Sequence, residues 1–347
     1  MRRFRLNCIA VGFSLVSALF SAQGAEVTTL YVASYGGSTE KVFREKIIPA
    51  FEAKNPVKIV YVAGTSTDTV AKLQARKGQQ QLNVVLLDDG PMYQAIQLGF
   101  CDKLSPAPIY SDLYPIARIG DHAVGIGVTV TGLAYNTDAF RKAKLPPPDS
   151  WLAIADPKYK QKVAVPSISN TYGLEALIML AKLRKGGEMN IDPGFELMGR
   201  DVAPNVVAWE SSSGKMTELF QTGEVTLAVW GSGRVQALKE TGFPVAFVVP
   251  KEGSPATFVT ACMVTQNHAP ALSQAFIQYL LAPEVQSQLA TASGWGPANA
   301  KAKLDPETAT KVPYGAEQIG RLITINWTVV NQKRAEWTDR WNRTVER

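Results

Sequence analysis

The chain has 347 residues, of which 46% are apolar, and 36 basic side chains stand against 30 acidic ones. This length allows about two domains, and the apolar content excludes a chain that is disordered as a whole. Acidic and basic residues alternate without a basic block, which argues against nucleic acid or an acidic membrane as a partner.

The first 25 residues follow the three-part pattern of a secretory signal peptide. Three arginines precede an apolar stretch from Leu6 to Phe20, and small residues follow it. We therefore expect export to the periplasm, with cleavage after Gly24 or Ala25. A membrane anchor is the alternative, because the uncharged stretch is just long enough to span a bilayer. Since cleavage removes three of the 36 basic residues, it leaves 33 against 30 acidic ones, a net charge of about +3.

Cysteine and histidine are scarce in the expected mature chain. Cys101 and Cys262 lie far apart in the sequence, and in an oxidising compartment they either form a disulfide or stay as two thiols. The two histidines, His122 and His268, have no metal-ligand spacing around them. We therefore predict no metal site and no cofactor.

Strands and helices alternate along the first part of the mature chain. Each apolar, β-prone run is followed by a segment whose apolar residues recur at helical spacing. Strands that are apolar throughout suit a mostly parallel sheet that is covered on both faces. The expected strands are 28–35, 57–62 and 83–87, and the expected helices are 38–54, 67–78 and 88–99.

A second alternation follows a break in the pattern. The apolar, glycine-rich run 123–137 and the proline-rich segment 144–151 separate the two series. The order of elements predicts an α/β fold of two lobes, each a mostly parallel sheet flanked by helices, with the second lobe inserted into the first and a cleft between them. The expected strands are 162–166, 205–209, 225–230, 244–250 and 257–265, and the expected helices are 171–183, 214–223, one within 231–242, 270–281 and a helical tail at 331–347.

The enzyme signatures in the chain are incomplete. "SSSGKMT" (211–217) has the Gly-Lys pair of a phosphate loop, but Met216 stands where such a loop needs Ser or Thr. "GSG" (231–233) lacks the Gly-x-Ser-x-Gly spacing of a nucleophile elbow. Catalysis therefore lacks support, and a secreted hydrolase that uses the cleft is the alternative from a different functional class.

Four strand-to-helix turns carry small polar and aromatic residues. In open α/β sheets, ligands bind at the carboxyl ends of strands, where these turns lie. A single turn of this kind is most often a helix N-cap, but four of them, two in each expected lobe, predict a shared solute pocket. The turns are Ser34-Tyr35-Gly36-Gly37, Asp88-Asp89-Gly90, Ser169-Asn170-Thr171 and Trp230-Gly231-Ser232-Gly233-Arg234.

A set of motifs runs through nearly all of the mature chain in a fixed order. It consists of "SYGG", "PAFEAKNP", "TGLAYNTDAF", "GEVTLAVW", "VVPKEG", "YLLAPEVQSQLA" and "NWTVVNQKRAEWTDRW". In this order the motifs resemble the periplasmic solute-binding proteins of ABC transporters, in the group that includes spermidine/putrescine-binding proteins. The resemblance implies a type II-like two-lobe fold, closure of a hinge on a small solute, delivery to a membrane permease, and a monomer in the periplasm.

The order of elements also gives expected boundaries for the two lobes. We expect the chain to cross between them at 131–133 and at 259–261, where small residues adjoin apolar runs. The first lobe is expected to comprise residues 26–134 and 259–308, and the second 135–258 with 309–347 packed across it.

The resemblance assigns ligand contacts to several residues. Ser34 and Tyr35 match a hydroxyl and an aromatic residue on the first turn, Trp230 matches a ligand-binding tryptophan of the second lobe, and Trp295 stands at a tyrosine position. Such aromatic side chains form flat walls against an alkyl chain or make cation–π contacts with an amine.

The chain departs from the polyamine-binding pattern where that pattern grips an ammonium group. Thr260 stands in place of an aspartate two residues after Phe258, and "SISNTYG" replaces an acidic pair, so that Asp88 or Asp89 would have to compensate. A polyamine or related amine is the expected solute, and a small carboxylate or phosphonate held by Arg234 and helix N-termini is the alternative. The predicted ligand residues are Ser34, Tyr35, Gly36, Asp88, Asp89, Asn170, Thr171, Trp230, Ser232, Arg234, Phe258, Thr260 and Trp295.

Overall fold

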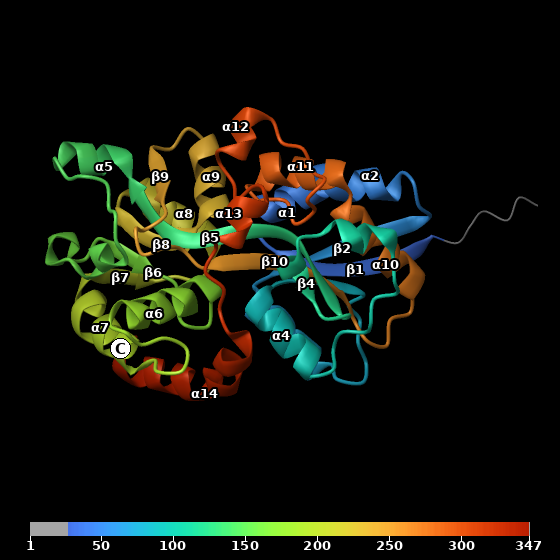
Figure 1. Cartoon of the computed structure of the whole chain (residues 1–347), viewed down its shortest axis with the longest axis horizontal. Coiled ribbons are helices and arrows are strands. Elements are labelled where there is room, and N and C mark those ends of the chain that lie inside the picture. Colours follow the sequence, from blue (N-terminus) through green and yellow to red (C-terminus); the bar gives the residue numbers. More distant parts are fainter. Residues whose placement is uncertain (1–26, 347) are drawn as a thin grey trace, which may run out of the picture.

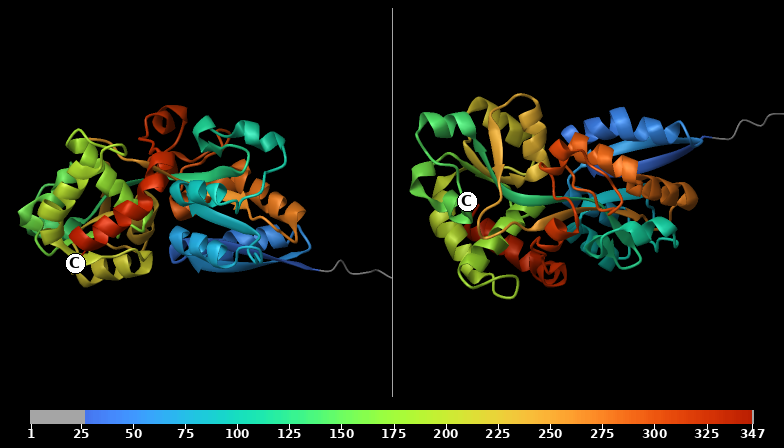
Figure 2. Two further views of the ribbon diagram at one scale, coloured as in Figure 1. Left: turned by 90° about the horizontal axis from the view of Figure 1, so that it is seen from below. Right: turned by 45° about the horizontal axis from the view of Figure 1, so that its top comes forward.

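The computed structural model describes residues 27–346, and its elements form two groups joined in the middle by long strands (Figure 1). The same two groups stand apart in both views of Figure 2. The predicted signal peptide, residues 1–25, lies outside the described residues. Within residues 27–346, no helix is long and apolar enough to cross a membrane.

The first group is built on three parallel strands in the order β2-β1-β3. Helices cover both faces of this sheet, and its strands bury continuous apolar runs such as Val84 to Leu87. α1 and α2 form one helical segment, because a π-helical turn, Phe43–Ile47, connects them. The elements are β1 (Thr28–Tyr35), β2 (Val57–Gly64), β3 (Val84–Asp88), α1 (Ser38–Val42), α2 (Ile48–Glu52), α3 (Ser66–Ala75), α4 (Asp89–Gln97), α10 (Pro270–Leu281) and α11 (Pro283–Ser293).

The second group repeats the arrangement with the parallel order β8-β6-β7. Its central helix, α6, is buried from Gly173 to Ala181 and packs on the sheet. The predicted α/β fold class is confirmed. The elements are β6 (Val163–Val165), β7 (Val206–Trp209), β8 (Leu227–Gly231), β9 (Val245–Val248), α5 (Thr137–Lys142), α6 (Thr171–Leu183), α7 (Asp192–Leu197), α8 (Ser213–Thr222) and α9 (Ser232–Glu240).

Two antiparallel strands, β5 (Ala123–Asn136) and β10 (Ala256–Met263), connect the groups. β5 pairs with β10 as far as Val130 and with β8 from Thr131 onward, so the chain passes between the groups at this point. β10 pairs with β3 from Val259 to Met263. The predicted crossing at 259–261 is therefore wrong, because these residues lie inside the sheet of the first group.

The C-terminal part of the chain returns across both groups. α14 (Trp327–Thr344) lies along the lower edge in Figure 1 and buries Trp337 and Trp341 in the apolar core of the second group. At its start it also contacts the first group, where Asn331 Nδ2 donates a hydrogen bond to the Gly90 carbonyl (3.0 Å). The shorter elements are β4 (Arg118–Ile119), α12 (Pro306–Ala309) and α13 (Ala316–Gly320).

The two cysteines are joined by a disulfide. Cys101 follows α4 and Cys262 lies on β10, and the two Cα atoms are 5.7 Å apart although 161 residues separate them in the sequence. Both side chains are buried. The alternative that the sequence left open is therefore resolved in favour of the bridge, which ties β10 to the first group.

Candidate functional site

A chamber of about 430 Å³ lies between the two groups of elements. From the first group, the turns that follow β1, β2 and β3 contribute its walls, so it lies at the carboxyl ends of parallel strands. From the second group, the first turns of α6, α8 and α9 complete it. The lining residues are Tyr35, Gly36, Gly37, Ala63, Gly64, Thr65, Ser66, Asp68, Asp88, Asn170, Tyr172, Ser211, Ser212, Ser213, Gly214 and Arg234.

Small residues and hydroxyl groups make this lining rich in hydrogen-bond donors. Gly37 caps α1 with a φ of 69°, a left-handed conformation that glycine adopts without strain. On the opposite wall Ser212 caps α8, where its Oγ accepts from the amide of Lys215 (3.4 Å). The first amides of a helix have no acceptor within the helix and carry the positive end of its dipole. The wall at Ser213 and Gly214 therefore favours oxygen atoms with negative charge.

Asp88 lies on the chamber wall with both carboxylate oxygens occupied. Tyr35 Oη donates to Oδ1 and Thr171 Oγ1 donates to Oδ2, each at 2.6 Å. Burial raises the pKa of Tyr35 well above its usual value, and the charge of Asp88 adds to this effect. Because Tyr35 belongs to the first group and Thr171 to the second, Asp88 links the two walls.

Arg234 reaches across the chamber from α9 to the first group. Its Nη1 donates to Thr39 Oγ1 (2.9 Å) and, at longer range, to Ser38 Oγ (3.4 Å) and the Gly36 carbonyl (3.5 Å). The guanidinium carbon lies 5.5 Å from the centre of the Tyr35 ring. All three oxygens are neutral, and Arg234 has no carboxylate within ion-pair distance among the described residues. Of the described residues that line the chamber, it is the only cation.

A narrow inner pocket continues the chamber toward Trp295. Its free volume of about 10 Å³ is roughly that of one water-sized probe. Trp295 stands edge-on to Tyr35, with ring centres 6.1 Å apart. The Ser293 hydroxyl, also in this lining, is buried and has no hydrogen-bond partner among the described residues. The inner pocket thus leaves an unused donor next to Arg234.

Six of the thirteen predicted ligand residues come together in this place. Ser34 is the exception within the first turn, because its side chain is buried and lines neither the chamber nor the inner pocket. Thr171 reaches the chamber through Asp88. The predicted residues on the chamber or inner-pocket wall are Tyr35, Gly36, Asp88, Asn170, Arg234 and Trp295.

The prediction that Trp230 lines the pocket is wrong. Trp230 is 2% exposed and stacks on Phe220 in the core of the second group, with ring centres 5.8 Å apart and planes within 12°. Successive side chains of a strand point to opposite faces. Gly231 therefore faces Tyr172, whose hydroxyl would lie 2.4 Å from a Cβ at that position. On the side of the second group, the aromatic residue of the chamber wall is therefore Tyr172 and not Trp230.

Asp89, Phe258 and Thr260 are also misplaced by the sequence prediction. They line a separate cavity of about 80 Å³ together with Trp327. Val259, between the two predicted residues of β10, is the one that lines the inner pocket. A shift of one residue along a strand moves a side chain to the other face, so an alignment error of one position accounts for this miss.

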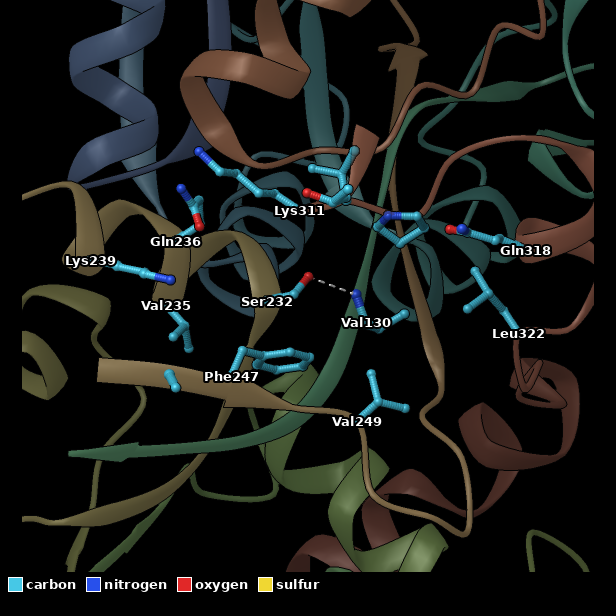
Figure 3. A pocket seen from close by; sticks show the side chains of 14 residues that line it. Val130, Ser232, Val235, Gln236, Lys239, Phe247, Val249, Lys311, Gln318 and Leu322 are labelled. Carbon is cyan, nitrogen blue, oxygen red and sulfur yellow. Dashed lines mark hydrogen bonds between the residues drawn. The ribbon is translucent and has the colours of Figure 1, made fainter. Parts of the chain in front are cut away.

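Ser232 lies in a third cavity, beside the strand crossing (Figure 3). Its Oγ accepts a hydrogen bond from the amide of Val130 (3.2 Å) and so pins the start of α9 to β5. The cavity measures about 460 Å³ and has an apolar floor that includes Phe247 and Val249. Ser232 thus lies at the strand crossing and not on the chamber wall.

Tyr172, Thr39 and the serines at the start of α8 line the chamber or inner pocket but were not among the predicted residues. The sequence does carry a signal for the serines, because Ser211, Ser212 and Ser213 stand between an expected strand and an expected helix. Tyr172 had no such signal, since it follows a normal N-cap, Asn170.

Glu175 is a buried acid below the chamber that the sequence did not single out. Its carboxylate accepts from Thr131 on β5 and from Thr257 on β10, the latter at 3.0 Å, so one side chain contacts both crossing strands. Burial raises the pKa of Glu175 well above its usual value, with Asp89 adding to the effect. Burial likewise raises the pKa of Asp89 to about 8, with Asp88 adding to the effect and the Trp327 indole opposing it.

These two raised pKa values predict that the stability of the ligand-free protein falls as pH rises. A carboxyl group with a raised pKa binds more protons in the folded state, so its contribution is complete below its unfolded pKa and is lost as pH passes through the folded value, about 8 for Asp89. Urea unfolding at pH 5, 7 and 9 should show this decline, and Asp89→Asn should flatten it. An equally steep decline in Asp89→Asn would contradict the assignment.

Comparison with known proteins gives one family match and several relatives. The model of the family described as bacterial extracellular solute-binding protein matches residues 46–314. The putrescine-binding periplasmic protein SpuD of Pseudomonas aeruginosa is 23% identical over 313 residues, which is 83% of each chain. The structure of an ABC transporter protein from Clostridium perfringens aligns with a TM-score of 0.72 and 24% identity over 91% of this chain and 99% of that one. The periplasmic binding protein AfuA from Actinobacillus pleuropneumoniae, with fructose-6-phosphate bound, aligns with a TM-score of 0.76 and 19% identity over 92% and 98%.

Proposed function

The chain belongs to the bacterial extracellular solute-binding proteins, and from this premise we propose that it captures a small anionic solute in the chamber beside Arg234. It is a periplasmic component of an ABC transporter and not an enzyme. Proteins of this kind bind a small solute and deliver it to a membrane permease. The open question is therefore the chemistry of the solute.

The unpaired guanidinium of Arg234 is the observation that carries the proposal. It bonds only neutral oxygens, although an arginine side chain forms its strongest hydrogen bonds with carboxylate or phosphate groups. The N-terminus of α8, at Ser213 and Gly214, lines the same chamber, and the first amides of a helix have no acceptor within the helix. A carboxylate, phosphonate or phosphate ester would satisfy both groups at once.

The amine predicted from the sequence is the second candidate. Two carboxylates line the chamber, and the relative from Pseudomonas aeruginosa is named for putrescine. Both carboxylates already have donors, however, because Asp68 accepts from the amide of Thr65 (3.2 Å) and Asp88 from Tyr35 and Thr171. An ammonium group would have to share these carboxylates with donors already present, whereas Arg234 has no charged partner, and this favours the anion.

We further propose that the two groups of elements are lobes that close on the solute. The sequence predicted the boundaries 26–134 with 259–308 and 135–258 with 309–347. The strand pairing favours crossings a few residues earlier, at Val130–Thr131 and at the start of β10. Three contacts support closure: Arg234 with Thr39, Thr171 with Asp88, and Thr67 Oγ1 with the Ser169 carbonyl (2.7 Å). Solute binding would shift the equilibrium toward this closed arrangement.

A thermal-shift screen of ligand-stripped protein tests the class of solute. Carboxylates, phosphonates and phosphate esters form one arm and polyamines the other, at matched ionic strength. We expect the largest rise in melting temperature in the anion arm, since a ligand at 100 times its Kd stabilises by about 2.7 kcal/mol. A rise confined to the polyamine arm would contradict the proposal and favour the second candidate.

A further inference from the structure

We propose that the cavity holding Asp89, Tyr93, Phe258, Thr260 and Trp327 is a second binding site, for a primary ammonium group. The cavity lies between α4, β10 and the segment that leads into α14, and it shares no lining residue with the solute chamber. The inference stands independently of the proposed function.

Asp89 is the group that requires a partner. Its side chain is 8% exposed. Burial raises the pKa of this carboxyl, and the Trp327 indole and the Gly90 amide, which donates to Oδ1 at 3.1 Å, oppose the rise. Among the described residues, no Lys, Arg or His forms an ion pair with it. A buried carboxylate without a cation is costly, and two neutral donors offset only a part of that cost. The site therefore has an acceptor to spare for a cationic donor.

The walls around Asp89 suit an organic cation. Phe258, Tyr93 and Trp327 bring three aromatic rings to a small volume, and the face of such a ring attracts an ammonium group. Trp327 is held in place against Gly90, where an added Cβ would lie 2.6 Å from the indole ring. Thr260 donates its hydroxyl proton to the Leu87 carbonyl (2.7 Å), which leaves its oxygen as an acceptor.

The charges near the cavity favour a cation over an anion. Burial raises the pKa of Asp89, Glu175 and Tyr93, and nearby carboxyl groups add to each shift: Asp88 for Asp89, and Asp89 for Glu175 and Tyr93. Three carboxyl groups thus influence this region. Within residues 27–346 no group of three or more His, Cys, Asp and Glu side chains is arranged to hold a metal ion. A single carboxylate with aromatic walls fits a monovalent organic cation better.

The volume limits the size of the bound group. The cavity measures about 80 Å³, several times the roughly 10–15 Å³ that one water molecule needs on this measure. This admits an ammonium group with a short alkyl chain. Tyr93 and Ile116, on the rim, are 39% and 37% exposed, so a longer alkyl chain has a path to solvent. The ligand class is therefore ammonium itself or the end of a primary alkylamine.

Methylammonium chloride is the probe for this site. At about 0.1 M it should raise the melting temperature of the wild-type protein by roughly 2 °C more than sodium or potassium chloride at equal ionic strength. Tetramethylammonium chloride, which has no N–H donor and is larger, should not. Comparison of ammonium chloride with butylammonium chloride separates the free ion from an alkylamine end. An equal response to potassium chloride, or none beyond sodium chloride, would overturn the proposal.

Three variants test whether the rise in melting temperature with methylammonium comes from this cavity. Asp89→Asn should abolish it, and Tyr93→Ala, at a partly exposed position, should weaken it without loss of the fold. Arg234→Ala should keep it, because Arg234 lines only the solute chamber and its inner pocket. If Asp89→Asn does not fold, the other two variants decide. A response that survives Tyr93→Ala unchanged, or that disappears in Arg234→Ala, would refute the second site.

Discussion

Replacement of Arg234 by alanine is expected to weaken binding of the anionic solute by about 2–5 kcal/mol, which is roughly 30-fold or more in Kd. The reason is that the variant leaves a desolvated anion without its charged partner, while Tyr35 and Thr39 offer only neutral groups. Isothermal titration of both proteins with the solute found in the screen measures the loss. The melting temperature of the ligand-free variant should change little, since Arg234 is partly exposed.

Two further variants make this prediction specific. Lys239→Ala removes the same charge from the same helix, α9, but Lys239 lines the cavity at the strand crossing and not the chamber. It should therefore leave Kd within about twofold, as distant exposed charges are screened by salt. Arg234→Lys keeps the charge and loses the planar fork, so it should give an intermediate Kd. Equal losses of solute affinity in Arg234→Ala and Lys239→Ala would mean that the net charge of the protein, and not a contact with Arg234, determines the affinity.

Replacement of Trp230 by alanine is expected to lower the free energy of unfolding by about 3–5 kcal/mol and to leave solute affinity unchanged. Trp230 is fully enclosed by the core of the second group, where it stacks on Phe220. The variant removes that contact and opens a cavity, but it does not touch the chamber. Urea denaturation gives the stability change, and titration below the unfolding transition gives Kd.

Trp295→Ala is the matched comparison for Trp230→Ala. Trp295 is equally buried, at 4% exposed, but its ring borders the inner pocket and meets Tyr35. This variant should lose both stability and affinity. If Trp230→Ala binds solute weakly and unfolds like the wild type, the assignment of Trp230 to the core is wrong.

Apolar periodicity predicted the elements of this fold well. The strand at 28–35 and the helices at 171–183 and 270–281 have the bounds that the sequence indicated. These segments bury continuous or regularly spaced apolar residues, so local pattern and tertiary packing agree. The turn at Gly36 and Gly37, which the sequence predicted as a pocket wall, lines the chamber, and glycine adopts the left-handed cap at Gly37 without strain.

The sequence did not predict which face of a strand each side chain occupies. Trp230 and Gly231 are neighbours on one strand, and a shift of one position decides which of them faces the chamber. The same holds for Phe258 and Val259 on β10. An aromatic residue near a predicted site is readily interpreted as a ligand contact, but Trp230 packs in the core of the second group.

The state of Asp88 depended on contacts that the sequence does not reveal. Tyr35 lies 53 residues and Thr171 lies 83 residues away in the chain, yet both donate to its carboxylate. Read as a free carboxylate, Asp88 favoured an amine. Both oxygens of Asp88 already accept hydrogen bonds, whereas Arg234 has no charged partner. The proposed solute is therefore an anion and not the amine predicted from the sequence.

The charge of the bound solute is the quantity that tests this account most directly. Protein purified from the periplasm without denaturation can be analysed by mass spectrometry for the small molecule it carries, with Arg234→Ala purified in parallel as the blank. The account predicts a carboxylate, phosphonate or phosphate ester that is enriched in the wild type and depleted in the variant. A polyamine retained equally by both proteins would contradict it.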